Sequence, residues 1–472
     1  MNMTGKSEGK LPKELVSVAL VLVLGAIAPM LDSTMVNIAI NNFSKDFHTS
    51  IDTIQWVITG YVLATGIAVP FSGWFINRFD GKNIYLVAQA LFLISSILSG
   101  TAWNIDSLIV FRLVQGFSAG LIIPLLTTLL VQAAGQENMG KLMSIVGMPI
   151  ILGPIIGPII GGVIVQYLSW RWIFFVNIPI GLIALYFIYK KLPSFAATNK
   201  QATFDWFGIL LLGGLSASFI YGITKASTGS GFNNSKTIEF VGLGIVLTII
   251  YIIYAFKRTE KAVLPLDLFK FKSFSASIFA LFLAGIGTNG PMLLLPLYFQ
   301  NIREDTVIFA ALSLIPQGLG MFLARPLIGK MIDKVGAKFV VIFAIVITFI
   351  GTLPFLWFSQ NTNYWVIAIV LFIRGIGVGG ITIPVMTDAY TGLSKKQIPQ
   401  ASIATRIIQN IGGAFGSAVL ATVVANQMSH VVPSISHLTS AYHAGFFIAT
   451  VLTVVMFIPA LFLTNKVKAK MQ

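Results

Sequence analysis

The sequence predicts an all-α, polytopic membrane protein with fourteen transmembrane spans. Hydrophobic residues make up 56% of the 472 residues and charged residues only 10%, which excludes a soluble globular protein of this length. The mean hydropathy of +0.87 agrees with this class. Apolar segments of helix length recur along the whole chain. The predicted spans lie near residues 15–40, 53–76, 84–103, 106–134, 139–166, 172–189, 206–224, 238–256, 274–300, 306–329, 339–358, 364–388, 398–427 and 443–465.

Most of the basic residues lie in the two tails and in alternate connections between the predicted spans. With the N-terminus inside, both tails and the even-numbered connections carry 22 of the 31 Lys and Arg residues, whereas the odd-numbered connections carry five. The positive-inside rule therefore predicts a multi-pass protein of the cell membrane with both termini in the cytoplasm. The net charge of +15 then reflects topology. We expect no nucleic-acid partner, because the basic residues do not gather on one soluble face.

Several chemistries are excluded by composition. The chain has no cysteine, so it has no disulfides, thiol catalysis or cysteine-ligated metal. Its four histidines, at 48, 430, 437 and 443, fall in predicted outer connections without metal-ligand spacing. The sequence GxxxxGK[ST] does not occur, which excludes an ATP-binding loop of that kind. We expect no enzyme and no cofactor, with an ion gradient as the energy source.

Two short turns reveal an internal repeat. GWFINRFDGK at 73–82 and GKMIDKVGAK at 329–338 are 256 residues apart, and each joins two predicted spans on the cytoplasmic side. Spans 1–6 and 9–14 then become equivalent six-helix bundles. We expect bundles at 1–192 and 273–472, with an inserted helix pair and its linkers at 193–272. Transporters built from such repeats bind substrate between the halves near mid-membrane.

Asp32 is the only carboxylate deep inside a predicted span. It lies roughly 25 Å along the helix from Leu15. An ionised carboxylate at that depth costs at least ~2.5 kcal/mol, so it needs a partner or a cavity. Burial favours its protonated form and a nearby arginine its ionised form, which makes Asp32 a candidate proton carrier. The alternative is a structural aspartate, permanently hydrogen-bonded with help from Ser33, Thr34 and Asn37.

Arg112 lies at a matching depth in the fourth span, in FRLVQGFSAGLIIP at 111–124. A buried guanidinium needs partners, and Asp32, or carbonyl groups together with Gln115, can supply them. A pair with Asp32 that breaks and reforms would couple proton movement to conformation. The alternative is a static brace.

Glycine and proline recur regularly in the fifth span, in LGPIIGPIIGG at 152–162. Small residues at every fourth position let another helix approach closely, and proline permits bending. The motif therefore predicts either tight packing or a gating hinge. Its residues are Gly153, Pro154, Gly157, Pro158 and Gly161.

The two basic turns form a further candidate gating element. Arg78 in the first turn, and Asp333 with Lys334 in the second, can make charged and capping contacts with neighbouring helices. They would then brace the cytoplasmic gate. The alternative is that these charges only fix the topology.

Polar, aromatic or flexible residues within spans are candidate contacts for flat, amphipathic small molecules. Each one taken alone could instead face lipid or the helix core. The candidates are Gln55, Trp56, Tyr61, Gln115, Asn289, Met292, Tyr298, Gln317, Met321, Gln409 and Asn410. The basic stretch 257–273 is expected to lie against anionic lipid headgroups.

Together these motifs resemble those of the fourteen-span drug:proton antiporter family of the major facilitator superfamily. LDSTMVNIAI at 31–40 is similar to the first-span pattern LDxTxVNxAxP, and RLVQGFSAG to the RxxQG motif. LGPIIGPIIGG resembles the antiporter motif of span 5, and the two turns resemble the GxxxDRxGRK loop. The most specific match is SWRWIFFVNIPIG at 169–181, which resembles the signature WRWIFxINxPIG. The resemblance runs nearly end to end.

This resemblance implies a major facilitator fold of two six-helix bundles plus two inserted helices. It further implies a monomeric, proton-coupled antiporter that exports amphipathic drugs by alternating access and confers antibiotic resistance. Asp32 would be a protonation site, Arg112 a coupling residue and the span-5 motif an antiport element. Substrates, protons and membrane lipids would be its partners.

The sequence departs from the family pattern in three places. Ile40 and Asn41 stand where the first-span proline is expected. The first turn has Asn77, Asp80 and Gly81 where the family has aspartate, glycine and arginine, so its gating charge is altered and Asp333 takes a larger share. In span 13, Gln409 replaces a usual arginine, and Arg406 lies nearly one turn earlier.

Two other functions fit parts of the sequence. The chain could export an endogenous metabolite, a siderophore-like compound or a lipid precursor, with drug efflux as a side activity. A membrane-bound receptor or enzyme fits less well, because neither a catalytic constellation nor a sizeable soluble domain is predicted.

Overall fold

The computed structural model describes residues 12–49, 51–134, 142, 153, 156–197, 204–226, 231–394, 397–428 and 434–464. Regular structure in these residues is helical throughout. In the described part of the chain, thirteen helices are long and apolar enough to cross a membrane, and a shorter apolar helix, Ile156–Tyr167, belongs to the predicted fifth span. The prediction of an all-α polytopic protein is confirmed.

The helices follow the predicted spans in order. They are α1 (Lys13–Met35), α2 (Ile40–Phe47), α3 (Ile51–Arg78), α4 (Gly81–Gly100), α5 (Ile105–Ala134), α7 (Trp172–Phe175), α8 (Asn177–Lys191), α9 (Trp206–Ala226), α10 (Ser235–Arg258), α11 (Lys272–Asn301), α12 (Val307–Leu312), α13 (Ile315–Val335), α14 (Ala337–Thr352), α15 (Tyr364–Ala389), α16 (Ile398–Met428), α17 (Ile435–Val455) and α18 (Phe457–Ala460). Short 3₁₀ turns join some of them, including Val36–Ala39 after α1.

Side-chain caps fix where several helices begin. An Asp80 carboxylate oxygen accepts a hydrogen bond from the Asn83 backbone N–H at 3.1 Å, which starts α4. The Asn363 side-chain oxygen accepts one from the Trp365 N–H at 2.8 Å, which starts α15. Such caps satisfy backbone donors that have no partner within the helix.

The predicted start of the last span, residue 443, is wrong. Helix α17 begins at Ile435, because the Ser434 hydroxyl accepts a hydrogen bond from the His437 N–H at 3.2 Å and caps the helix. The first turns are polar and gave no hydropathy signal. His437 and His443 therefore lie in a helix and not in an outer connection, and the His443 ring Nε2 lies 2.7 Å from the Phe358 carbonyl oxygen.

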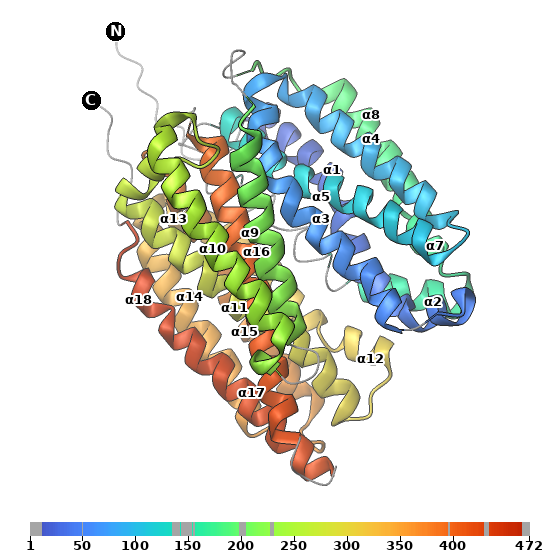
Figure 1. The fold of residues 1–472 in the computed structure, drawn as a ribbon. Coiled ribbons are helices and arrows are strands. Elements are labelled where there is room, and N and C mark those ends of the chain that lie inside the picture. Colours follow the sequence, from blue (N-terminus) through green and yellow to red (C-terminus); the bar gives the residue numbers. More distant parts are fainter. Residues whose placement is uncertain are drawn as a thin grey trace.

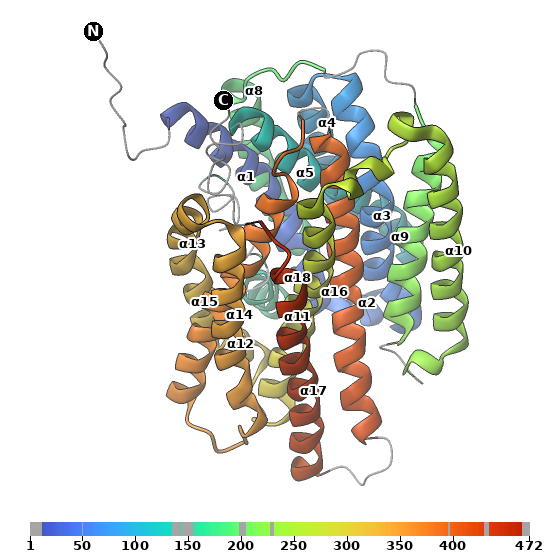
Figure 2. The same ribbon diagram turned by 90° about the vertical axis from the view of Figure 1, so that its left-hand side faces the viewer.

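Two groups of helices lie on either side of the molecule (Figure 1). We call Lys13–Lys191 the N-terminal half and Lys272–Ala460 the C-terminal half. In the first, α5 packs against α1, α3 and α4; in the second, α15 packs against α11, α13 and α14, and α11 packs against α16. The inserted pair α9 and α10 runs along α16 (Figure 2). Helix α9 contacts both α3 and α16 and so bridges the halves.

One large apolar cluster joins the two halves. It includes Val18 and Leu129 from the N-terminal half, and Ile328, Ile383 and Ile398 from the C-terminal half. Toward the opposite ends of the helices, each half has a core of its own. The halves are therefore packed together at the end where α1 begins and α13 ends.

Candidate functional site

Asp32 and Arg112 meet inside the N-terminal half, as their depths predicted. The Arg112 guanidinium donates from Nη1 to the Asp32 carboxylate, and the two form an ion pair. Asp32 is 0% exposed and Arg112 1%. Because ion pairs are costly to bury, such a pair persists only where its remaining hydrogen-bonding groups are also satisfied.

Three further polar side chains complete this network. Gln115 donates from Nε2 to Asp32 Oδ1 at 3.2 Å, and its own oxygen accepts from Arg112 Nη1 at 2.6 Å. Asn177 donates from Nδ2 to the same Asp32 oxygen at 3.0 Å. Ser96 accepts from Gln115 Nε2 at 2.7 Å and from Asn177 Nδ2 at 3.4 Å. We call Asp32, Ser96, Arg112, Gln115 and Asn177 the Asp32 network.

Every partner of the Asp32 carboxylate is a donor. Arg112, Gln115 and Asn177 each direct an N–H group at it, which is the arrangement that stabilises an ionised carboxylate. The Asn177 Oδ1 atom, in contrast, is buried and has no hydrogen-bond partner among the described residues. The site therefore holds an unused acceptor on a side chain that already touches Asp32.

Four helices converge to build the network. Asp32 comes from α1, Ser96 from α4, Arg112 and Gln115 from α5, and Asn177 from the first position of α8. Arg112 and Gln115 are three residues apart, so they lie on one face of α5. Because each side chain is held by another helix, a movement of α1 relative to α5 must disturb the Asp32–Arg112 contact.

Aromatic rings cover the guanidinium. The Tyr61 ring centroid lies 4.0 Å from the Arg112 guanidinium carbon, and the Phe174 centroid 5.7 Å. The Tyr61 hydroxyl donates to the Pro29 carbonyl oxygen at 3.3 Å, and Arg112 Nε donates to the Val57 carbonyl oxygen at 3.2 Å. Tyr61 thus ties α3 to α1 directly over the ion pair.

The glycine face of the fifth span packs against the turn of α1 that carries Asp32. A Cβ atom at Gly157 would lie 1.9 Å from the Thr34 hydroxyl, and one at Gly153 3.1 Å from Met30. The Gly161 position is equally close to Met35. This geometry accounts for the close packing that the spacing predicted. Pro154 lies outside the described residues, and the hinge role of this motif stays a prediction.

The C-terminal half contains two further buried arginines among the described residues, Arg325 of α13 and Arg374 of α15. Arg374 donates to the Gln317 side-chain oxygen at 2.8 Å, to the Thr352 hydroxyl at 3.2 Å and to the Gly287 carbonyl oxygen at 3.3 Å. All three acceptors are neutral. Within the part of the chain that the structure describes, Arg374 forms no ion pair.

The structure separates the predicted substrate contacts into two groups. Five are held in other interactions: Gln115 in the Asp32 network, Tyr61 on Arg112, Gln317 on Arg374, Trp56 on the Tyr221 ring of α9, and Tyr298 in the C-terminal core. Tyr298 is 0% exposed and donates to the Ser359 carbonyl oxygen at 3.1 Å. We therefore leave Tyr298 out of the proposed site, whereas Trp56, although it stacks on Tyr221, is 43% exposed and stays a candidate contact.

The second group stays accessible, on α3, α11 and α16. Gln55, Met292, Gln409 and Asn410 are half-buried, and Asn289 is exposed. Asn289 lies beside Gly413, where an added Cβ atom would be 2.0 Å from its amide nitrogen. Met321 is largely buried and packs with Val378 and Ile159, between the halves.

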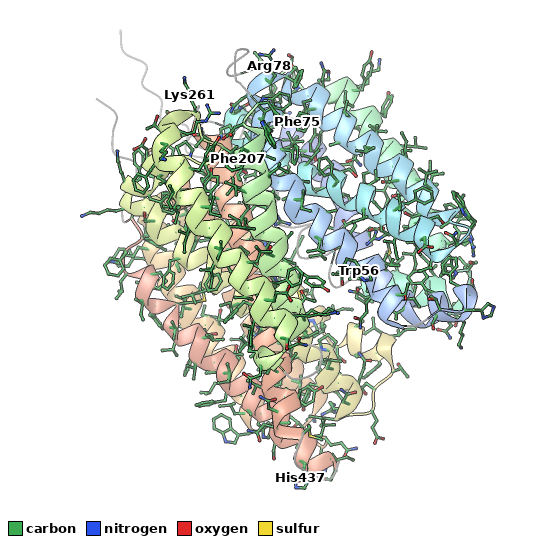
Figure 3. All side chains as sticks on the ribbon, in the orientation of Figure 1. Trp56, Phe75, Arg78, Phe207, Lys261 and His437 are labelled. Carbon is green, nitrogen blue, oxygen red and sulfur yellow. The ribbon has the colours of Figure 1, made fainter. Side chains whose placement is uncertain are left out.

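The first basic turn, whose sequence departs from the family pattern, makes contacts that the sequence did not predict. Asp80 caps α4 and also accepts a hydrogen bond from the Ser194 hydroxyl, and the Gly81 N–H donates to the Phe195 carbonyl oxygen at 2.9 Å. This turn is thus tied to the segment after α8. Arg78 and Lys334 are exposed, and the Asp333 side chain lies outside the described atoms. Figure 3 shows Arg78 and Lys261 at one end of the molecule and His437 at the other.

Ser96 and Asn177 were not predicted as site residues. Asn177 had a signal, because it is the polar residue within SWRWIFFVNIPIG, the most specific stretch of the sequence. Ser96 is one of three serines in α4, and nothing in their spacing singles it out. Among the described residues, no group of three or more His, Asp or Glu side chains is placed to hold a metal ion.

Comparison with known proteins agrees with this architecture. The Major Facilitator Superfamily sequence model matches residues 22–417. The chain is 30% identical over 412 residues to the multidrug resistance protein B homolog of Mycobacterium tuberculosis, covering 87% of this chain and 76% of that protein. It is 29% identical over 423 residues to the multidrug export protein EmrB of Haemophilus influenzae, covering 88% and 82%.

A solved structure shares the fold at low sequence identity. The double-tryptophan mutant of XylE superimposes with a TM-score of 0.69 at 17% identity, covering 97% of each chain. The prediction that the chain is not an enzyme is confirmed, because this family consists of transporters. With a family match over most of the sequence and a relative at 30% identity, the chain belongs to the Major Facilitator Superfamily.

Proposed function

We propose that this chain is a proton-coupled antiporter that exports amphipathic drugs across the cell membrane by alternating access. The names of two relatives, a multidrug resistance protein B homolog and a multidrug export protein, support the substrate class. The observation that carries the coupling is the Asp32 network, since a fully buried carboxylate held by a movable arginine can trade a proton for cargo. The distribution of Lys and Arg supports cytoplasmic termini.

The proton would reside on Asp32. In its ionised form this carboxylate accepts from Arg112, Gln115 and Asn177. Once protonated, its hydroxyl needs an acceptor, and the unpartnered Oδ1 of Asn177 can supply one if the amide turns over. Arg112 would then keep Gln115, the Val57 carbonyl and the Tyr61 ring as partners, so it stays satisfied while its bond to Asp32 weakens.

Release of this ion pair would favour rocking of the halves. Asp32 sits on α1, against the glycine face of the fifth span, and Arg112 on α5. The apolar cluster that joins the halves closes the proposed cytoplasmic end. Drug would bind to ionised protein open to the cytoplasm, leave on the outer side as a proton arrives, and the proton would be delivered inward on return.

The driving force suffices for export. One elementary charge moving across 100 mV yields ~2.3 kcal/mol, enough for roughly a 50-fold gradient of a neutral drug per proton. Exchange of one proton for one monovalent cationic drug moves no net charge, so it would depend on the pH gradient alone. Imposing the two gradients separately therefore also reports the charge of the cargo.

The decisive experiment is dye efflux from proteoliposomes under an imposed pH gradient, comparing wild type with Asp32→Asn. We expect the variant to lose at least ~100-fold in gradient-driven flux, because the amide cannot carry a proton. The matched control is Asp106→Asn, which makes the same change at an exposed carboxylate in the first turn of α5 and should transport like wild type. Gradient-driven flux in Asp32→Asn equal to wild type at every pH would remove the coupling claim.

A second candidate function is export of an endogenous metabolite. The accessible polar residues on α11 and α16, Asn289, Gln409 and Asn410, suit a polar cargo as well as a drug. Metabolite profiling of a deletion strain, beside dye export in the same strain, separates the two. Accumulation of one metabolite with unchanged dye export would favour this second function.

A further inference from the structure

A long apolar cavity lies outside the transport path, between the inserted pair and the C-terminal half. Its volume is about 1480 Å³. Helices α9 and α10 form one wall, through residues such as Phe219 and Ile245, and α11 and α16 form the other, through Phe282, Ile411 and Phe415. We call this space the insertion groove. It extends from the start of α10 to the segment that follows its end.

The charged groups of the groove lie at one end. Asp267 and Lys270, from the segment between α10 and α11, line this end together with Thr259, whereas the rest of the lining is aliphatic and aromatic apart from Thr237, Thr248 and the Tyr251 hydroxyl. Around the same end, five exposed basic residues follow each other in sequence. They are Lys257, Arg258, Lys261, Lys270 and Lys272. Lys270 also pairs with Asp267 at 2.5 Å.

Helix α10 lacks protein packing along this groove. Only 17% of the most apolar stretch of α10 is buried within the protein, against 61% for the corresponding stretch of α9. The main helix partner of α10 is α9. A Cβ atom added at Gly242, on the groove wall, would meet no atom within 4 Å. Side chains that border an unfilled space lose their dispersion contacts, so an apolar occupant would stabilise this arrangement.

We propose that the insertion groove binds an anionic phospholipid. Its acyl chains would lie between α10 and α16, and its headgroup would sit among the five basic residues. The charge pattern selects an acidic headgroup, since each basic residue near a membrane surface attracts anionic lipid. The basic end also lies on the proposed cytoplasmic side, where anionic lipids are enriched.

The lipid would link the inserted pair to a helix of the transport path. Ile407, Ile408 and Ile411 of α16 face the groove, and Gln409 and Asn410, interleaved with them, are candidate substrate contacts. A lipid in the groove would therefore pack against the face of α16 that is opposite its candidate substrate contacts. This gives the inserted pair a role that does not depend on proton coupling.

The test measures lipid retention by the full-length protein. Protein reconstituted in mixed phosphatidylglycerol and phosphatidylcholine vesicles is extracted into detergent and analysed by native mass spectrometry. We expect wild type to retain one phosphatidylglycerol. Gly242→Trp should weaken its retention, because the indole would occupy part of the space between α10 and α16 that an acyl chain needs. Replacing Lys257, Lys261 and Lys270 with Gln should weaken retention roughly 100-fold, as expected for three lost charges.

Ile250→Trp is the matched control. It adds the same side chain to the same helix, but Ile250 is exposed, does not line the groove and lies on a different face of α10 from the groove-lining residues, so retention should equal that of wild type. Equal retention by Gly242→Trp and wild type would overturn the proposal. So would equal retention of phosphatidylcholine, or displacement of the lipid by an exported dye. Lipid retention is read without transport, so its failure is distinct from failure of the antiport proposal.

Discussion

The two halves of the molecule each bury an arginine, but in chemically different surroundings. Arg112 in the N-terminal half has a carboxylate partner, Asp32. Among the residues that the structure describes, Arg374 in the C-terminal half has only neutral acceptors: Gln317, Thr352 and the Gly287 carbonyl. Only the first set contains an acid whose protonation can change. The comparison therefore assigns the proposed proton chemistry to the N-terminal half and a bracing role to its counterpart.

The internal repeat makes this comparison a matched one. Tyr61 and Gln317 are 256 residues apart, as are Ser96 and Thr352, and the two basic turns have the same separation. Glycines after Gln115 and Arg374 pack in the same way: Cβ atoms at Gly116 and Gly375 would lie 2.3 and 2.1 Å from the Tyr61 and Gln317 carbonyl oxygens.

Arg374 thus stands where the N-terminal half has Gln115. Both side chains donate to the hydroxyl of the equivalent helix, Gln115 to Ser96 at 2.7 Å and Arg374 to Thr352 at 3.2 Å. The two halves therefore share a hydroxyl acceptor at this position, but the donor is an amide in the N-terminal half and a guanidinium in the C-terminal half. A buried guanidinium without an acid adds rigidity through its hydrogen bonds but offers no proton switch.

The largest expected effect comes from replacing Arg112 with glutamine, and the same substitution at Arg374 is its counterpart. Arg112→Gln leaves Asp32 without its counter-charge, and removing one partner of a buried ion pair costs about 3–5 kcal/mol. The Asp32 network then lacks the charge partner on which the proposed coupling depends. We expect gradient-driven efflux in proteoliposomes to fall at least ~100-fold, the factor that corresponds to the lower end of this cost.

Arg374→Gln should be tolerated, because Gln115 already occupies the equivalent place. The variant loses some hydrogen bonds but removes an unpaired charge, so we expect flux within about 3-fold of wild type. Its thermal midpoint in detergent should fall measurably, because those hydrogen bonds are lost, while its flux stays close to that of wild type. Equal loss of gradient-driven flux in the two variants, with both folded, would break the comparison.

A smaller effect is expected from Asn177→Leu. The substitution removes a donor to the ionised carboxylate, a bond to a charged group worth about 1.5–3 kcal/mol. It also removes the acceptor proposed for the protonated form. Because the ionised form loses more, the pH at half-maximal flux should rise, but by less than the roughly 1–2 units that loss of the donor alone would give. A fall in thermal stability with an unmoved pH midpoint would show that Asn177 only packs.

The sequence predicted the central pair because depth along a helix can be counted. At 1.5 Å per residue, Asp32 and Arg112 reach the same height from opposite membrane faces, and few other partners are available there. The close approach of the fifth span to another helix was predictable in the same way, from the spacing of its glycines.

The other residues of the site could not be predicted by counting positions along one helix. The spans are apolar on most faces, so periodicity does not show which face of α3 or α11 meets the other half. Tyr298 was a candidate substrate contact by residue type, yet it lies fully buried in the C-terminal core. Ser96 and Asn177 join the network only because α4 and α8 converge on Asp32.

The smallest expected effect concerns the two hydroxyls that the repeat has kept. Ser96→Ala removes the acceptor that orients Gln115 and Asn177 toward Asp32, a loss of about 1 kcal/mol from the ionised form. The pH at half-maximal flux should rise by about half a unit. Thr352→Val removes the equivalent acceptor from Arg374, so it should lower the thermal midpoint without moving the pH midpoint. A pH shift in Thr352→Val as large as in Ser96→Ala would mean that the C-terminal arginine also takes part in coupling, because a brace without an acid has no means of sensing protons.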